Sequence, residues 1–255
     1  FMAGAESAFG KSQAGNGNGE QGRALEALKY AENLLAEEAE RLARQLRREV
    51  KKRVTDGLTI MLEEQTAVRE RTVALQSPVK EGSRQALAAV AALAKREERI
   101  AAVAQELINV VEETEFGIAL PAALAAVRDA TDSVQMSLAD GDASSDVVAA
   151  EKQIEADLKA MLDVVSEMSD ANSRSGRRGG QSADEQRKEQ SRIISELKML
   201  RLLQSRVHQS TIDVDGKRAS AALTSVLRKR IEDLEGRQED VRDATERLAE
   251  ARGDE

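Results

Sequence analysis

One motif occurs three times in the chain: a glutamine, a valine three residues later, a threonine four residues after that and an aliphatic residue three further on. The copies are Gln65-Val68-Thr72-Leu75, Gln204-Val207-Thr211-Val214 and Gln238-Val241-Thr245-Leu248. Steps of three and four residues return to one face of an α-helix, because a turn takes about 3.6 residues. The motif therefore predicts three helices, each with a face that carries both polar and apolar side chains.

The same spacing extends towards the N-terminus of each copy. Aliphatic residues stand seven and four positions before each glutamine, as Leu58 and Met61, Leu197 and Leu200, and Ile231 and Leu234. A fourth copy, over residues 86–107, has Glu97 at the glutamine position and Ala104 at the threonine position. We call the shared helix face the seam, and we expect four helices to carry it.

The composition agrees with a fold made of long helices. Aromatic residues make up 2% of the 255 residues, charged residues make up 33%, and there are two prolines and no tryptophan. Long helical bundles fill their cores with Leu, Val, Ile, Met and Ala, whereas large globular cores and catalytic clefts draw on aromatic rings. We therefore expect an all-α, elongated fold of tandem helical hairpins or a coiled-coil bundle.

Net charge and hydropathy exclude several classes of protein. The formal net charge is −8, so no overall positive field attracts nucleic acid. The absence of cysteine rules out disulfides and thiol chemistry but fits a reducing or an oxidising compartment. No apolar run is long enough to cross a membrane, and no signal peptide is recognisable. Because Met2 follows Phe1, we expect a portion of a longer polypeptide.

Glycine, proline and aspartate mark the expected helix ends. The breaks are Gly15-Asn16-Gly17-Asn18-Gly19, Ser77-Pro78, Phe116-Gly117, Asp140-Gly141-Asp142, an Arg/Gly/Ser-rich flexible linker over 171–184, and Asp215-Gly216. Thr55-Asp56-Gly57 is too weak a break to end a helix, since one glycine costs only about 1 kcal/mol. Ser83 is the expected N-cap of the helix that follows Pro78. The resulting helices cover about 1–13, 21–76, 83–113, 120–138, 145–170, 185–214 and 218–251.

The spacing of the motif copies indicates a tandem duplication. Glu97 follows Gln65 by 32 residues, and Gln238 follows Gln204 by 34 residues, so each half ends in a similar pair of helices. A Gly-rich or Asp/Gly turn precedes the long helix in both halves. We therefore predict two helical repeats, residues 1–113 and 114–255, with the flexible linker 171–184 inserted in the second.

Three segments of the chain read GRALEALKYAENLLAEE, LPAALAAVRDATDSVQMSLADGD and SELKMLRLLQSRVHQSTIDVD. They resemble segments of large, uncharacterised helical coiled-coil proteins of planctomycete bacteria. In that family a Gly/Gln-rich linker precedes the leucine-rich helix, whereas the linker here is rich in Arg, Gly and Ser. The resemblance implies an envelope- or membrane-associated protein and transfers no functional residues.

Residues suited to catalysis or metal binding are sparse. His208, the only histidine, follows the seam residue Val207 and is expected at the surface. The carboxylates do not cluster in a recognised metal-binding pattern, and their partners one helical turn away are mostly Arg and Lys. No phosphate loop, nucleophile elbow or dinucleotide fingerprint occurs. We therefore expect no enzyme activity, no cofactor and no metal.

Two readings remain for a basic segment over residues 41–53. Its cations, Arg44, Arg47, Arg48, Lys51 and Lys52 among them, either pair with nearby glutamates as an ordinary solvated helix face or contact nucleic acid or an anionic membrane. Arg174, Arg177 and Arg178 in the linker have no aromatic neighbours to stack bases and indicate a solvated linker.

The polar seam positions also have two readings. They either set the alignment of the helices, as a buried asparagine does in coiled coils, or line a polar ligand channel. We favour alignment and predict that Gln65, Gln204 and Gln238 face inward at equivalent places, together with Thr72, Thr211 and Thr245. The expected function is a structural or protein-interaction scaffold that binds protein partners or itself. The alternative is a helical binding module that contacts nucleic acid or an anionic membrane through the basic segment 41–53.

Overall fold

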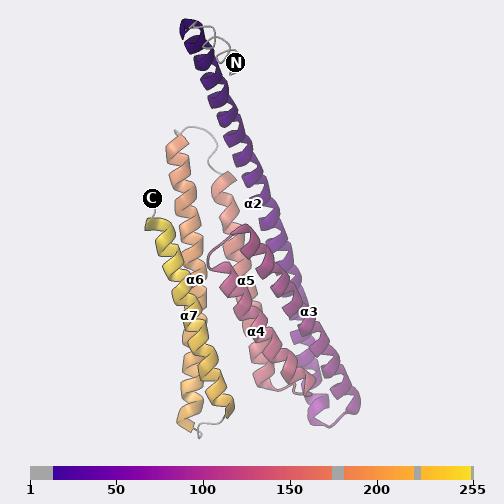
Figure 1. Ribbon diagram of the computed structural model, residues 1–255. Helices are drawn as coiled ribbons and strands as arrows, with labels where there is room; N and C mark the ends of the chain where they lie inside the picture. The colour runs from indigo at the N-terminus through magenta and orange to yellow at the C-terminus, as the bar shows by residue number, and fades with distance from the viewer. Residues whose placement is uncertain (1–13, 174–180, 221–224, 254–255) are drawn as a thin grey trace. The chain divides into compact units, whose positions relative to one another are not determined.

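The computed structural model describes residues 14–173, 181–220 and 225–253, and these residues form six α-helices and no strand (Figure 1). The helices are α2 (Ala14–Lys80), α3 (Arg84–Thr114), α4 (Leu120–Ala139), α5 (Ser145–Ser173), α6 (Gln181–Ser220) and α7 (Ser225–Gly253). The predicted all-α fold class is therefore confirmed. None of the described helices has the length and hydrophobicity needed to cross a bilayer.

The chain divides into two compact units, residues 1–49 and residues 50–255. In the first unit, the described residues belong to α2. In the second, residues 50–80 of α2 join the five other helices. The predicted repeat boundary between residues 113 and 114 falls in the last turn of α3, inside the second unit, and the duplication remains a prediction.

Residues 50–80 of α2 form a four-helix bundle with α3, α4 and α5. Short connections make successive helices antiparallel (Figure 1). Hydrogen bonds between Thr72 and Glu151 and from Arg69 to Glu155 join α2 to α5 and close the ring of helices. Aliphatic side chains fill the interior, and the largest fully buried ones are Leu58, Met61, Leu120, Leu124, Leu138, Ile154, Leu158 and Met161.

The weak break at Gly57 is a point of close packing. Helix α2 continues through residues 55–57, as predicted. A Cβ atom on Gly57 would lie 2.9 Å from both terminal methyl carbons of Leu107 on α3. The absence of a side chain at residue 57 therefore lets α2 and α3 approach each other.

The loops of the bundle follow the expected turn chemistry. Ser83 caps α3, since its side chain accepts a hydrogen bond from the Ala86 amide over 3.3 Å, and the N-cap prediction is confirmed. Gly141 in the predicted Asp-Gly-Asp turn has φ of +80°, a conformation that glycine adopts without steric cost. In the same loop, Asp142 accepts a hydrogen bond from the Ser144 amide just before α5.

Helices α6 and α7 form an antiparallel pair that packs on α4, and α6 also packs on α5. The buried apolar residues of the α6–α7 pair are Met199, Leu200, Leu203, Val207, Val241 and Ala244. The two helices run antiparallel in Figure 1, while the connection at 221–224 lies outside the described residues and the tandem-hairpin arrangement remains a prediction.

Glu196 of α6 caps the N-terminus of α4. Its two carboxylate oxygens accept hydrogen bonds from the amides of Ile118 over 3.1 Å and Ala119 over 2.9 Å. Glu196 is buried, and no side chain of α4's own N-cap residue makes a capping bond. A Cβ atom on Gly117 would lie 3.1 Å from a Glu196 oxygen, so glycine leaves room for the carboxylate. A negative charge at this end of a helix is stabilised by the unpaired amides there.

Two predicted helix ends in α2 are wrong. Residues 15–19 are helical, because α2 begins at Ala14, and helix continues past Ser77 through Pro78 to Lys80. Helix propensity is a weak determinant that context overrides, and a proline in a helix's final turn removes only one backbone donor. The helix predicted over 1–13 lies outside the described residues.

Two predictions in the second half are wrong in part or whole. Asp215 and Gly216 lie inside α6, which continues to Ser220, so they form no turn. Of the predicted flexible linker 171–184, residues 171–173 belong to α5 and 181–184 to α6, while 174–180 lie outside the described residues. A single glycine on an exposed helix face costs about 1 kcal/mol, which is too little to end a 40-residue helix.

Candidate functional site

Gln65 on α2 and Glu97 on α3 meet in the core of the four-helix bundle. Both residues are fully buried, with 0% exposure. The Gln65 side-chain amide donates to Glu97 Oε1 over 2.8 Å. The other two oxygens, Gln65 Oε1 and Glu97 Oε2, are buried and have no hydrogen-bond partner among the described residues. The pair therefore leaves one oxygen of each side chain without a hydrogen-bond donor.

Thr72 and Glu151 form a second buried polar pair, between α2 and α5. Both are 0% exposed. The Thr72 hydroxyl oxygen lies 2.7 Å from Glu151 Oε1 and 3.1 Å from the carbonyl oxygen of Val68. Glu151 Oε2 has no hydrogen-bond partner among the described residues. One hydroxyl proton thus faces two acceptors.

Burial raises the pKa of both carboxyl groups. For Glu97, loss of hydration raises the pKa to about 8, with a further increase from the charge of Glu151 and a decrease from the Gln65 hydrogen bond and Arg96. For Glu151, burial raises the pKa to about 7, while the Thr72 hydrogen bond and Arg69 lower it. A carboxylate that leaves water without a cation in contact is destabilised, so the neutral acid is favoured.

The corresponding residues of the α6–α7 pair are exposed. Gln204 and Gln238 each donate to the other's side-chain oxygen over 3.3 Å. Both residues are exposed, so the prediction that they face inward is wrong, whereas Gln65 does lie inside. The buried face of α6 includes the seam residues Leu200 and Val207 together with Met199 and Leu203, while the seam residue Leu197 is 52% exposed.

The threonines of the motif share a local role. Thr211 and Thr245 each donate to the carbonyl of the valine four residues earlier, Val207 and Val241, over 2.7 Å. Thr72 has the same contact with Val68, and it alone of the three is buried and meets a second helix. The valine–threonine spacing therefore places a hydroxyl on the preceding turn, and only Thr72 lies at a contact between bundle helices.

A buried ion pair between α5 and α6 was not predicted. Asp157 and Arg206 form it, with side-chain exposures of 5% and 12%, and Gln153 donates to Asp157 Oδ1 over 3.0 Å. Burial lowers the pKa of Arg206 to about 10, and the charge of Arg237 lowers it further while Asp129 raises it. Arg206 lies between seam positions on α6. Its partner Asp157 is 49 residues away in the sequence, and the helical periodicity does not indicate a contact over that separation.

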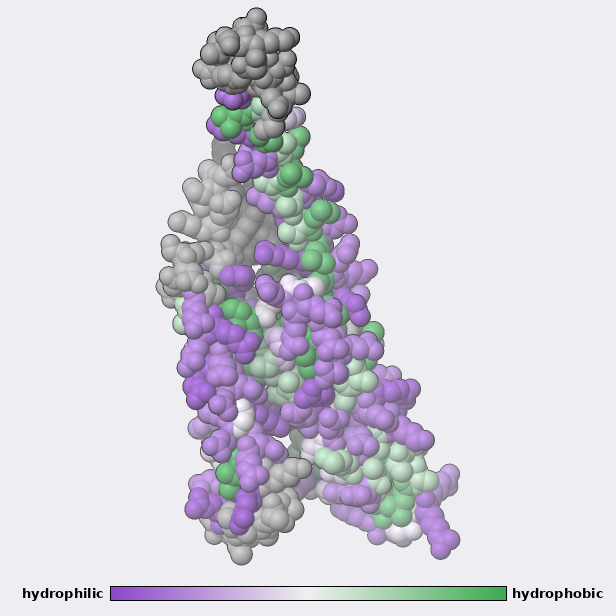
Figure 2. All heavy atoms as spheres, viewed as in Figure 1, coloured by the Kyte–Doolittle hydropathy of each residue, from purple (hydrophilic) through white to green (hydrophobic). Residues whose placement is uncertain are grey.

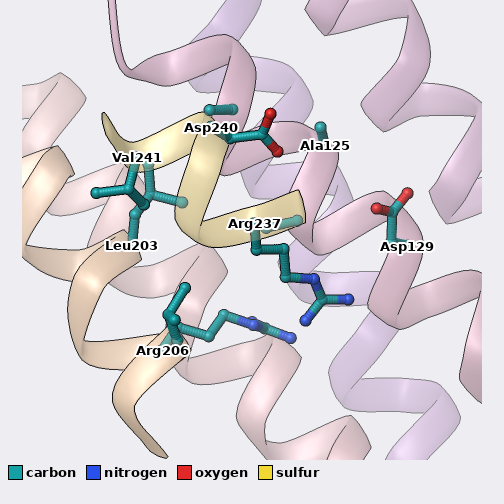
Figure 3. A pocket seen from close by; sticks show the side chains of 10 residues that line it. Ala125, Asp129, Leu203, Arg206, Arg237, Asp240 and Val241 are labelled. Carbon is teal, nitrogen blue, oxygen red and sulfur yellow. The ribbon is translucent and has the colours of Figure 1, made fainter. Parts of the chain in front are cut away.

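A small pocket adjoins this ion pair, between α4, α6 and α7 (Figure 3). The guanidinium groups of Arg206 and Arg237 lie together in it, and Asp129 and Asp240 belong to its lining. Its volume is about 20 Å³, enough for a single water molecule. The pocket is too small for an organic substrate.

The basic segment is partly engaged within the protein. Arg41 pairs with Glu38 and Arg44 with Glu40, both on the surface of α2. Lys51 donates to the carbonyl oxygen of Ser166 on α5. The remaining predicted anion contacts, Arg47, Arg48 and Lys52, are exposed. The pairing of Arg41 and Arg44 agrees with an ordinary solvated helix face. Arg47, Arg48 and Lys52 are the exposed cations that could contact nucleic acid or an anionic membrane.

The described part of the first unit is a helix with large apolar side chains in solvent (Figure 2). We call the face formed by Leu25, Leu28, Leu35, Leu42 and Leu46 the leucine stripe. Its residues are between 48% and 71% exposed. Their spacing by three, four and seven residues places them on one side of the helix, and the charged residues Glu37 and Arg44 fall on the opposite side.

The remaining predicted features bear on catalysis and metals. His208 is exposed, as expected. Among the described residues, no group of three or more His, Asp or Glu side chains is arranged to hold a metal ion. Comparison of the chain with family models, with curated proteins and with solved structures finds no significant match.

Proposed function

We propose that the protein is a non-enzymatic scaffold that binds other proteins through its helix faces. The leucine stripe is the observation that carries this proposal. Large apolar side chains lined up on one helix face usually mark a protein-binding surface, whereas scattered ones need no explanation. The resemblance to planctomycete coiled-coil proteins supports a role within a longer, envelope-associated polypeptide built from tandem helical repeats.

The stripe is long enough for stable association. Each leucine that moves from water into an interface contributes about 1.5–3 kcal/mol when fully buried. Five such residues on one helix, with neighbours at steps of three, four and seven, match the side-chain spacing of helix-to-helix recognition. A partner helix laid along residues 25–46 is therefore the simplest occupant.

Site-specific photo-cross-linking in the producing cells tests this function. A photoreactive residue replaces Leu35 or Leu42 on the stripe, and the matched controls replace Glu37 or Arg44 on the opposite face. We expect discrete protein cross-links from positions 35 and 42 and none from 37 and 44. Equal labelling from both faces, or none from the stripe, would contradict the scaffold. Cross-links to nucleic acid or lipid at position 44 would instead favour the basic-segment alternative.

A further inference from the structure

Two glutamine-containing pairs in this protein use the same motif positions but differ in hydrogen bonding. In the exposed pair, Gln204 and Gln238 exchange two hydrogen bonds, each amide donating once and accepting once. In the buried pair, Gln65 donates to Glu97 and receives nothing in return. An ionised carboxylate has no proton to give, so a buried Gln–Glu pair with a charged Glu97 leaves Gln65 Oε1 unsatisfied.

We propose that Glu97 is a neutral carboxylic acid at neutral pH, donates its proton from Oε2 to Gln65 Oε1, and so makes the stability of the four-helix bundle depend on bound protons. With that proton, the two oxygens that lack partners satisfy each other, and the pair acquires the same two-bond ring as Gln204 and Gln238. Protonated glutamate then matches glutamine in shape and in hydrogen bonding, which explains how Glu97 occupies a glutamine position of the motif.

The hydrogen bonds of Thr72 indicate that Glu151 is also protonated. The hydroxyls of Thr211 and Thr245 donate to the carbonyl four residues earlier, and Thr72 lies within 3.1 Å of the equivalent oxygen of Val68. If Thr72 uses its single proton there, the proton in its 2.7 Å contact with Glu151 comes from Glu151. The bonds then form a continuous chain from Glu151 through Thr72 to the Val68 carbonyl.

Within the described parts of the chain, no cation forms an ion pair with either Glu97 or Glu151. From α2, Glu64 is paired with Arg96 of α3, and Arg69 is paired with Glu155 of α5. Helix α4 contributes the uncharged buried residues Thr131, Val134 and Leu138. Glu97 and Glu151 repel each other when both are charged, and each pKa lies above its ordinary value for the reasons of burial given above. Holding both protons is therefore favoured by burial and by mutual repulsion together.

The sign of the pH dependence follows from proton counts. Both acids lose their protons near pH 4.5 in the unfolded chain but hold them to about pH 7 for Glu151 and about pH 8 for Glu97 in the folded bundle. Between these limits the folded state binds more protons, so its stability falls as pH rises. Between its pKa in the unfolded chain and its pKa in the folded bundle, each acid raises the unfolding equilibrium constant by up to about tenfold per pH unit. The stabilisation of the folded state by each acid is therefore fully present only at acidic pH.

The experiment measures urea unfolding of the whole chain between pH 5 and pH 9 for the wild type and for Glu97→Gln. The amide introduced by this substitution keeps both hydrogen bonds to Gln65 without a titrating proton. We expect the unfolding constant of the wild type to rise more steeply with pH than that of the variant, by up to about tenfold per unit, and the curves to become parallel above about pH 8. The matched control, Gln238→Glu in the exposed pair, is expected to leave the pH slope unchanged.

Infrared spectroscopy of the folded wild type gives a second readout that does not depend on stability. Protonated carboxyl groups have a carbonyl band distinct from that of carboxylates. At pH 6.5 we expect this band in the wild type and a weaker one in Glu97→Gln. Absence of the band from the wild type, or the same pH slope in the wild type and Glu97→Gln, would overturn the proposal.

Discussion

At the scale of single residues, the polar side chains act by satisfying backbone or buried groups in a neighbouring helix. Thr72 reaches back to the Val68 carbonyl and across to Glu151. Glu196 supplies acceptors for the two amides that α4's own sequence leaves without a capping side chain. A buried backbone donor without a partner costs about 1–3 kcal/mol, so these contacts carry more weight than the surface ion pairs.

Replacing Glu196 by glutamine is expected to lower the free energy of unfolding by about 1–3 kcal/mol, measured by urea denaturation at pH 7. Glutamine offers one oxygen where Glu196 offers two, so the amide of Ile118 or of Ala119 loses its acceptor and meets an NH₂ group instead. The control Glu167→Gln removes only a surface ion pair with Lys198, and a change within about 0.5 kcal/mol is expected there. Equal losses in the two variants would mean that the cap contributes nothing beyond an ion pair.

Sequence periodicity identified some of these residues and missed others for a physical reason. Gln65 and Glu97 belong to repeated helical patterns, so their spacing predicts that both lie on contacting faces. Glu196 and Arg206 interact with residues 77 and 49 positions away, and nothing in a local pattern encodes which loop or helix such a side chain reaches. Gln204 shows the converse error, since it occupies the same motif position as Gln65 and is exposed, although Leu200 and Val207 of the same pattern are buried.

At the scale of helices, the apolar stripes predict the existence of an element more accurately than its ends. The bounds of α3 and α4 agree with the expected ranges to within two residues. Ser83 caps the start of α3, Glu115 in the left-handed conformation ends it, and Pro121 lies in the first turn of α4. The glycines at 15–19 and Gly216 end no helix. Gly57 is explained by tertiary packing, since its missing side chain makes room for Leu107.

Replacing Gly57 by alanine tests that close approach. Alanine favours helix over glycine by about 1 kcal/mol, but the new methyl group would lie 2.9 Å from Leu107, and overpacking of this kind costs about 1–3 kcal/mol. We expect a net loss of stability in thermal unfolding, which Leu107→Val in the same chain partly reverses. The control Gly236→Ala on α7 has no atom within 4 Å of the new carbon and is expected to raise stability. A gain at both positions would show that α2 and α3 are not in contact at Gly57.

At the scale of the whole molecule, the hydrophobic core found among the described residues lies in residues 50–255. Of the buried hydrophobic residues in the described part of the chain, all but Ala24 belong to this unit. Its bundle is closed by contacts between α2 and α5, whose residues are 79 and 86 positions apart in the sequence. Repeated motifs indicated pairs of helices but not this closure, because the contacts that complete a ring of helices follow from packing rather than from the spacing within one helix. The leucines of the stripe, in the other unit, are exposed.

The unit formed by residues 50–255 is therefore expected to fold when produced without residues 1–49. Its hydrophobic core remains complete, and the helix that is removed carries exposed leucines instead of buried ones. Circular dichroism should show a single cooperative thermal transition whose midpoint lies within a few degrees of that of the intact chain, since a change of 1 kcal/mol shifts the midpoint of a domain of this size by about 2–4 °C. A broad, non-cooperative transition would show instead that the first 49 residues help to nucleate or cover the bundle.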